Sequence, residues 1–424
     1  NNIQLDPNYL GLDIDRSNDQ IRPGKLFPRW EPLQLQLLPS LKNPQRNSVS
    51  FTPFIGWNNY DKLMPGLVIT NWTFPGNKFS WALNPMYGLG SQTVVGHAFA
   101  SYRQDFDRGI IQYVKLGALA RSFHYLSRFE QDYQLLYDKI EPQIQVRFRS
   151  NPLKDQRSTI SFRMNHLRQQ TAQFDSEGQF RDTEVAIINF YQIKYDFQRF
   201  RSYNPVRWEI ELTNSRFNNP FDLESYWQLS STYATKWFYK KDKAVDVRLY
   251  GGVLLSASRD PGINLLPQAF DATVQGWNDF AFDNYFFGRS DRSGFWNRQI
   301  VIEEGGFKNA FGPGQRLGRS NDYLFAINLM ADLPMDLPLD LPIRPYLDIG
   351  YLDTGENNPN LSADDPFLLS GGLALDIWHN RLAIYFPLVH SQNISDQFAG
   401  QGSFGQRISF TMNLTGLKIQ EILN

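Results

Sequence analysis

Apolar and polar residues alternate with a period of two through most of the chain. In the stretch 78–87, every second residue from Phe79 on is apolar, and Lys78, Ser80, Ala82 and Asn84 fall on the other face. The apolar members are Phe79, Trp81, Leu83, Pro85 and Tyr87. Because successive side chains of a β-strand point to opposite faces, this pattern predicts a strand with one apolar and one polar face.

The same alternation recurs along the chain, for example in 143–149, 191–198, 206–212, 245–249 and 408–414. Taken together, these stretches predict about sixteen strands. Their expected ranges are 49–58, 61–73, 77–87, 92–103, 109–123, 138–150, 157–170, 183–199, 204–214, 224–238, 243–256, 321–333, 342–352, 367–378, 380–388 and 405–414.

The spacing of two tryptophans fits the thickness of a bilayer. Trp227 and Trp237 lie on the same face of one predicted strand, ten positions apart. At about 3.3 Å per residue and a tilt of roughly 45°, they are separated by ~23 Å along the membrane normal. The apolar band between aromatic girdles is ~25 Å tall. The sequence therefore predicts an all-β fold, a transmembrane antiparallel up-and-down β-barrel, and the alternative is a soluble sandwich with one solvated face.

Connection lengths indicate an orientation. Long connections are expected at 126–137, 171–182, 215–222, 257–320, 353–366 and 390–404, with short ones between them. Outer-membrane barrels have short periplasmic turns and long external loops, so both termini are predicted in the periplasm. Residues 1–47 lack the alternation and are expected to form a periplasmic lead-in before a barrel at 48–424, whose long external loop spans about 257–320.

Composition agrees with a barrel and excludes other classes. Aromatic residues make up 15% of the chain, yet the mean hydropathy is only -0.44, and no run of 18 apolar residues allows a transmembrane helix. A formal net charge of -1 gives no basic field for nucleic acid. Cysteine is absent, which excludes disulfides and thiolate metal sites. No export signal is visible at Asn1, so we expect the gene product to begin upstream.

Two sets of side chains are candidates for functional surfaces. The first is expected to face lipid or to form the aromatic girdles: Phe79, Trp81, Tyr87, Tyr191, Tyr195, Trp208, Trp227, Trp237 and Phe410. The second is expected to line the lumen: Arg147, Arg149, Arg163, Lys194, Asp196, Arg207, Glu209, Glu211, Asp246 and Arg248. The second set could select ions, but its mixed signs on neighbouring strands favour cross-strand ion pairs.

No catalytic, cofactor or metal site is predicted. The five histidines are His97, His124, His166, His379 and His390. None forms an HExxH pair, and the acidic pairs Asp13/Asp15 and Asp364/Asp365 lack an EF-hand pattern. The glycines at 305–306 and 312–314 lack the lysine of a phosphate-binding loop. These residues are interpreted as solvated or structural.

Several stretches resemble a known family. They are 53–71 with Trp57-Asn58-Asn59-Tyr60-Asp61-Lys62, 78–87, Phe286-Phe287-Gly288-Arg289, Glu304-Gly305-Gly306-Phe307-Lys308 and Leu347-Asp348-Ile349-Gly350. They resemble the C-terminal membrane barrel of Bacteroidota envelope proteins that carry an N-terminal gluzincin-type aminopeptidase domain. The resemblance spans nearly the whole chain. It implies that zinc ligands would lie in the peptidase domain, and no position here matches them.

Three functions are compared on this basis. The first is a membrane anchor or scaffold for a periplasmic domain or partner, with outer-membrane lipid, lipopolysaccharide and other envelope proteins as partners. The second is a channel or transporter, in which the loop 257–320 would fold inward as a constriction. The third is an enzyme inside the barrel, for which the sequence offers no convergent nucleophile and base. The anchor is the leading hypothesis, and the chain itself is expected not to be an enzyme.

Overall fold

The computed structural model of the chain is almost entirely β-structure. It describes residues 3–4, 20–21, 32–43, 46–128, 133–219, 222–258, 270–312, 317–335, 341–353, 365–378, 382–400 and 403–412. In this described part of the chain, no helix is both long enough and apolar enough to cross a membrane.

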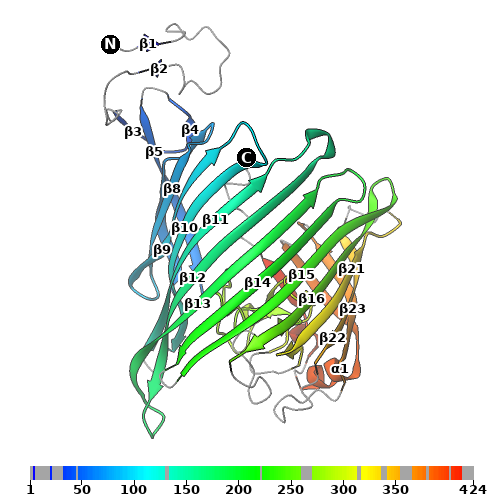
Figure 1. The fold of residues 1–424 in the computed structure, drawn as a ribbon. Coiled ribbons are helices and arrows are strands. Elements are labelled where there is room, and N and C mark those ends of the chain that lie inside the picture. Colours follow the sequence, from blue (N-terminus) through cyan, green and yellow to red (C-terminus); the bar gives the residue numbers. More distant parts are fainter. Residues whose placement is uncertain are drawn as a thin grey trace.

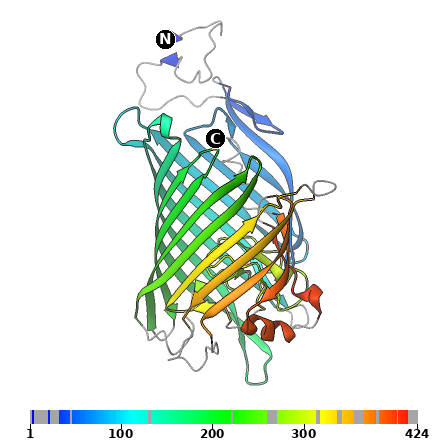
Figure 2. The ribbon, with the colours of Figure 1, turned by 90° about the vertical axis from the view of Figure 1, so that its right-hand side faces the viewer.

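One closed barrel contains nearly all the strands (Figures 1 and 2). Sixteen strands of the described chain follow one another around its wall, each antiparallel to the next. They are β5 Asn47–Asn58, β6 Lys62–Thr70, β8 Phe79–Gly88, β9 Thr93–Asp105, β10 Ile111–Arg128, β11 Tyr133–Phe148, β12 Gln156–Phe174, β13 Phe180–Arg199, β14 Val206–Asn219, β15 Asp222–Lys240, β16 Lys243–Ala257, β21 Tyr323–Ala331, β22 Ile343–Leu352, β23 Phe367–Asp376, β24 Leu382–His390 and β25 Ser409–Met412. The predicted fold class is confirmed.

Burial alternates along the wall strands as the sequence pattern predicts. In β21 and β22, every second residue is buried, and the residues between them are more exposed. Cross-strand partners share a face, so the register carries this division around the barrel. We call the end of the barrel at which β5 begins the near end, and the opposite end the far end; the near end is uppermost in Figure 1.

Six wall strands extend further than predicted at the far end. β12 and β13 reach Phe174 and Phe180, so the expected loop 171–182 is mostly strand. The loops expected at 126–137 and 215–222 are likewise largely taken up by β10, β11, β14 and β15. Around 181–185, both faces are exposed, which identifies this region as a sheet in water rather than a loop. Three of the connections that were predicted to be long are long in the structure: 258–322, 353–366 and 391–408.

Short elements surround the wall. Among the described residues, five short strands precede β5 or lie between β6 and β8: β1 Ile3–Gln4, β2 Gln20–Ile21, β3 Leu33–Gln36, β4 Ser40–Leu41 and β7 Thr73–Phe74. β3, Leu33–Gln36, pairs in parallel with the start of β5, so part of the predicted lead-in belongs to the sheet. One α-helix, α1 Gln392–Ala399, lies in the connection before β25, and single 3-10 turns occur at Pro152–Lys154, Trp296–Arg298 and Phe404–Gln406.

The connection between β16 and β21 differs most from its prediction. It was expected to be external, but its described residues 270–312, which we call the inner segment, are largely buried. They contain β17 Phe270–Asp271, β18 Val274–Gln275 and β19 Gln299–Val301, and β20 Arg319–Ser320 follows them. The inward position follows from composition, because a run this rich in aromatic residues gains more by packing against the wall than by contact with water.

Candidate functional site in the lumen

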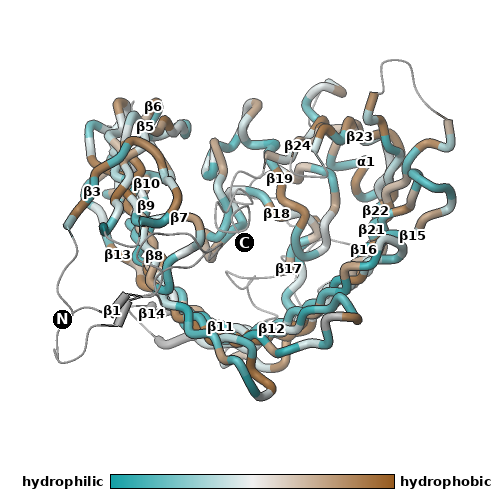
Figure 3. Tube along the Cα trace, turned by 90° about the horizontal axis from the view of Figure 1, so that it is seen from above, coloured by the Kyte–Doolittle hydropathy of each residue, from teal (hydrophilic) through white to brown (hydrophobic). Residues whose placement is uncertain are grey.

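The inner segment fills the barrel. Seen from above, β17, β18 and β19 lie inside the curve of wall strands (Figure 3). Phe270, Ala272 and Phe307 are buried there. Gly252 of β16 permits this close approach, because a Cβ at that position would stand 2.6 Å from the Phe270 ring.

Phe282 is the centre of one apolar contact between segment and wall. Its ring lies 4.3 Å from that of Tyr137 and 5.6 Å from that of Tyr125, measured between centroids. Phe190 and Tyr226 belong to the same buried cluster. Aromatic pairs at these distances stabilise beyond the area they bury. The far half of the lumen is therefore apolar where the segment packs.

A second apolar cluster joins the segment to the later strands. Phe307 and Phe311 pack with Leu324 of β21 and Leu368 of β23. Phe398 of α1, which is fully buried, belongs to the same cluster. The amphipathic helix thus closes over the segment from the connection that precedes β25.

Asp283 fixes the segment to the wall by charge. Arg163 Nη2 lies 2.6 Å from Asp283 Oδ2, and Lys139, which is 1% exposed, also donates to Asp283. Glu141 accepts from Lys139 at 2.9 Å, and Arg121 Nη1 donates to the Asp283 carbonyl at 2.9 Å. Burial opposes ionisation of Asp283, but the charges of Arg163 and Lys139 outweigh it and hold the pKa of that carboxyl well below its usual range.

A second set of polar contacts lies further along the segment. Lys308 Nζ lies 2.5 Å from Asp348 Oδ1 of β22, and both side chains are buried. Asn328 Nδ2 donates to Gly305 O at 2.9 Å, and Arg248 Nη1 donates to Glu304 O at 2.6 Å. Buried charges are tolerated when they are paired in this way. Residues from β16, β21 and β22 therefore hold one turn of the segment.

The segment also lies between the first and last wall strands. β19 pairs in parallel with β25, and Asn59 N–H donates to Phe287 O at 2.8 Å. The Trp296 ring contacts that of Trp57 of β5, with centroids 4.9 Å apart and planes tilted by 47°. Phe410 of β25 was predicted to face lipid, but it is 6% exposed. The reason is that Phe295 covers it, with ring centroids 4.6 Å apart and planes 9° apart.

Two carboxyl groups meet within the connection itself. Asp271 N–H donates to Glu304 Oε2 at 2.6 Å, and Arg319 Nε donates to Asp271 Oδ1 at 2.8 Å. Burial raises the pKa of Asp271 to about 6, and the charge of Arg319 offsets this only in part. Arg319 therefore holds this end of the segment together.

A pocket of about 450 Å³, with both apolar and charged lining residues, opens between the inner segment and the wall at the near end. Its charged lining residues are Arg199, Arg207, Lys236, Asp246, Arg248, Lys308 and Arg344. Carboxylates engage several of these cations: Arg344 contacts Asp246 at 2.5 Å, and Lys236 contacts it at 3.4 Å. The pocket is large enough for a small solute, and most of its charged lining residues are ion-paired.

The residues predicted to line the lumen are found largely in such pairs. Lys194 lies 3.0 Å from Glu209, and Arg207 lies 2.6 Å from Glu209 and 3.2 Å from Asp196. Glu211 accepts from Gln192 at 2.9 Å. Arg147 stands over the Tyr113 ring at 5.4 Å, and Arg149 donates to Gly109 O at 3.0 Å at the near rim. Arg163, Asp246 and Arg248 have the contacts already described, so the structure brings the whole set to the interior or its rim.

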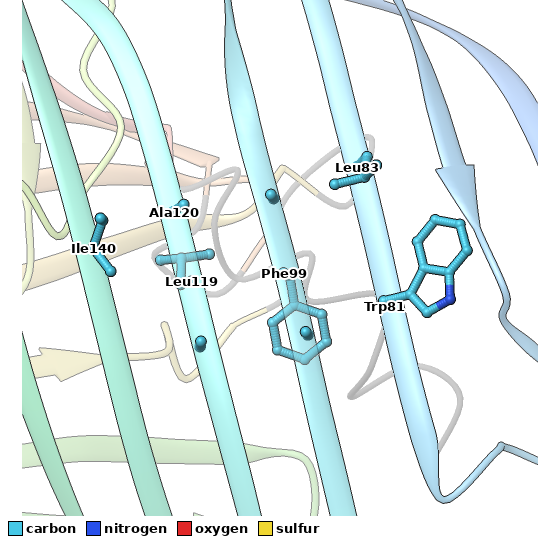
Figure 4. A pocket seen from close by; sticks show the side chains of 9 residues that line it. Trp81, Leu83, Phe99, Leu119, Ala120 and Ile140 are labelled. Carbon is cyan, nitrogen blue, oxygen red and sulfur yellow. The ribbon is translucent and has the colours of Figure 1, made fainter.

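The residues predicted for the outer surface differ in exposure. The exposed ones, at 41–62%, are Phe79, Tyr87, Trp208, Trp227 and Trp237. Trp81, Tyr191 and Tyr195 are half-buried. Trp81, Leu83 and Ile140 border a shallow apolar groove of about 500 Å³ whose floor contains Ala98, Ala100, Ala118 and Ala120 (Figure 4).

The described histidines do not converge. His124 Nδ1 lies 2.6 Å from Asp61 Oδ1, and His166 Nδ1 lies 2.7 Å from Asn189 Oδ1. His97 is on β9 and His390 ends β24, next to the Phe398 ring. His379 lies outside the described residues. Within the part of the chain that the structure describes, no group of three or more metal-binding side chains gathers.

Sequence reasoning missed the contacts of the inner segment, because it assigned 257–320 to the exterior. The signal was present in the chain. Trp277, Phe280, Phe282, Tyr285, Phe286, Phe287, Phe295 and Trp296 follow one another within twenty residues. A solvated external loop of this length would not be expected to carry so many aromatic side chains.

The fold and the filled lumen define a transmembrane antiparallel β-barrel. No family model and no curated protein matches the chain. Solved structures with a similar fold include "The crystal structure of BamA from Haemophilus ducreyi lacking POTRA domains 1-3", with 13% identity, a TM-score of 0.43 and coverage of 82% of this chain and 67% of that one. "CdiB from Acinetobacter baumannii" has 12% identity, a TM-score of 0.37 and coverage of 84% and 62%. "Copper transporter OprC" has 9% identity, a TM-score of 0.38 and coverage of 79% of this chain and 53% of that one.

Proposed function

We propose that the chain is an outer-membrane β-barrel whose lumen is occupied by its own inner segment, and that it anchors a periplasmic domain or partner protein. The observation that carries the occluded lumen is the pairing of Asp283 and Lys308 with charged wall side chains. The anchoring role rests on the family resemblance. A segment held by ion pairs and two apolar clusters supports an occluded barrel more than an open pore.

Membrane insertion of the wall has a measurable consequence at Ile193. This side chain is 49% exposed on β13, opposite in direction to Gln192 and Lys194. We expect Ile193→Arg to lower the free energy of unfolding by roughly 2–4 kcal/mol, because Arg would enter hydrocarbon near mid-bilayer. Reversible unfolding in phospholipid vesicles, followed by tryptophan fluorescence, measures this.

The matched control is Val185→Arg, eight positions away on the same face of β13. Val185 is 43% exposed and lies in the far-end region 181–185, where both faces of the sheet are exposed. Val185→Arg should lower the free energy of unfolding by only about 0–1 kcal/mol, as expected near or beyond the membrane–water interface. An equal loss of unfolding free energy in both variants would contradict insertion of the wall at the depth proposed.

The orientation follows from connection lengths. We place the near end in the periplasm, because the longest connections, 258–322, 353–366 and 391–408, all lie at the far end. An epitope tag joined to Asn1 should then resist protease added to intact cells and be cleaved after the outer membrane is opened. Cleavage in intact cells, with the barrel folded, would reverse the orientation and remove the basis for a periplasmic cargo.

The peptidase association rests on the family resemblance, which places the zinc site upstream of this chain. We expect residues 1–424, folded in detergent with zinc supplied, to release no amino acid from aminoacyl test substrates above a blank. A zinc hydrolase needs about three protein ligands and a base around one open coordination position. Zinc-dependent hydrolysis that is lost on replacing one histidine here would refute the anchor proposal and place an active site in the barrel.

Transport of a small solute is the second candidate. The observation that favours it is the near-end pocket of about 450 Å³ between the inner segment and the wall. Transport through this barrel would require the inner segment to move, because Asp283 and Lys308 are paired to the wall. Conductance of the intact protein separates the two candidates.

A further inference from the structure

Five leucines at the near end are exposed, two of them in β3 of the barrel sheet and one in β4. Leu33, Leu35, Leu37, Leu38 and Leu41 are 57–74% exposed. The intervening Gln34 and Gln36 are half-buried. We call the five leucines the leucine edge. Strand alternation alone therefore gives β3 one apolar face and one polar face.

The register shows which way that apolar face points. Gln34 pairs with Ser48 and Gln36 with Ser50, and both serines are buried. Leu35 instead pairs with Val49, which precedes the exposed Phe51 by two positions. Side chains two apart share a face of the sheet. The leucines of β3 thus continue the outer face of β5, the face on which Phe51 and Ile55 are exposed.

Hydrogen bonds hold the leucine edge against the wall. Thr52 Oγ1 donates to Leu37 O at 3.1 Å, and Ser40 Oγ donates to Gln36 Oε1 at 2.9 Å. β4 then pairs with β7, where Leu41 lies opposite Phe74. Phe74 is itself 55% exposed, so it extends the apolar surface onto the next strand connection.

β3 also completes the pairing of β5 at the near end. Within the described residues, β5 pairs with β6 on one side, and residues 47–50 pair with 33–36 on the other. In hydrocarbon each unsatisfied backbone group costs several kcal/mol, so this pairing suits a strand inside the bilayer. A strand in this position needs apolar side chains toward lipid, which the leucine edge supplies.

We propose that β3 and the residues up to Leu41 are a lipid-contacting part of the wall, with phospholipid acyl chains of the near-end leaflet as the occupant of the leucine edge. Continuity with the outer face of β5 argues for lipid, and exposed Arg46 and Lys78 at the same rim suit anionic headgroups. This inference rests on the proposed membrane insertion of the barrel. For residues 33–41, it replaces the expectation of a purely periplasmic lead-in.

Because the chain has no cysteine, single-cysteine variants can be labelled without further changes. Leu35→Cys and Gln34→Cys would carry a nitroxide on the outer and inner faces of β3, in the full chain folded into phosphatidylethanolamine and phosphatidylglycerol vesicles. Ile55→Cys, at a position 68% exposed on β5, is the lipid reference, and Leu153→Cys, at a turn position 93% exposed, is the water reference. Collision with oxygen reports lipid, and collision with a soluble nickel chelate reports water.

The label at position 35 should resemble that at 55, with a ratio of oxygen to nickel collisions several-fold higher than at 34 or 153. Nickel accessibility at 35 equal to that at 153, while 55 still reports lipid, would overturn this inference and leave membrane insertion intact. A label at 35 that is sheltered from both reagents would assign the edge to a protein partner and also overturn it. Water accessibility at 55 would instead contradict the proposed insertion of the barrel.

Discussion

The intact protein should carry little or no steady current across a planar bilayer, and a variant lacking residues 273–310 should form long-lived open channels. A wall of this strand number can enclose an aqueous channel once its interior is emptied. The deleted residues include Phe282, Asp283 and Phe307, which make the main apolar and ionic contacts with the wall. Single-channel recording after reconstitution measures the change.

The deletion also removes β19 and its contact with β25, so a milder variant is needed in case the barrel does not close. Phe282→Ala combined with Asp283→Asn leaves residues 285–301 in place while removing the contacts to Tyr137 and Arg163. It should give brief openings that the parent lacks. Large, long-lived openings in the intact protein would favour transport over anchoring. A folded deletion variant that stays silent would show that the inner segment does not block the lumen.

Asp283→Asn alone should lower the free energy of unfolding by about 3 kcal/mol. The substitution leaves Lys139 and Arg163 to share Glu141, and an uncompensated buried charge typically costs about 3–5 kcal/mol. Chemical unfolding in mixed micelles, followed by tryptophan fluorescence, measures this. Asp105→Asn is the control, because Asp105 pairs with Arg103 at 2.7 Å on the surface, where a pair contributes about 0–1 kcal/mol.

The effect of Asp283→Asn should depend on pH in a defined direction. Because the pKa of Asp283 is depressed in the folded state, its contribution is fully present above about pH 3.9, the unfolded value. The contribution is lost only as pH falls below that value toward the folded pKa. The difference between parent and variant should therefore be constant from pH 8 to pH 5. A difference that vanishes between pH 7 and pH 5 would contradict the assigned ion pair.

The wall was predictable from the sequence because its physical cause is local. Lipid on one side and polar groups on the other impose a two-residue period on every wall strand, as in 191–198 and 206–212. β12 continues beyond residue 170, and β13 begins before residue 183. These extensions were not predictable in this way, since both faces of that region meet water and the two-residue period is lost. The turn residues Asp175 and Gly178 mark the true reversal.

The interior could not be predicted to the same degree. Its contacts join residues far apart in sequence, such as Lys139 with Asp283 or Asn59 with Asp291, and no local period records them. The lumen charges were recognisable because they share strands with apolar outer residues. Phe410 was misassigned for the same reason, since its place in an alternating strand says nothing about Phe295 stacking over it.

The parallel pairing of β19 with β25 makes the interior part of the seam of the wall. Among the described residues, β25 pairs with β24 on one side and with β19 of the inner segment on the other. The rings of Trp296 and Phe295 contact Trp57 and Phe410, which belong to the first and last wall strands. Removal of the inner segment would therefore take away a pairing partner of the last wall strand as well as the filling of the lumen. Wall and interior form one hydrogen-bonded unit, and the interior is not a separable insert.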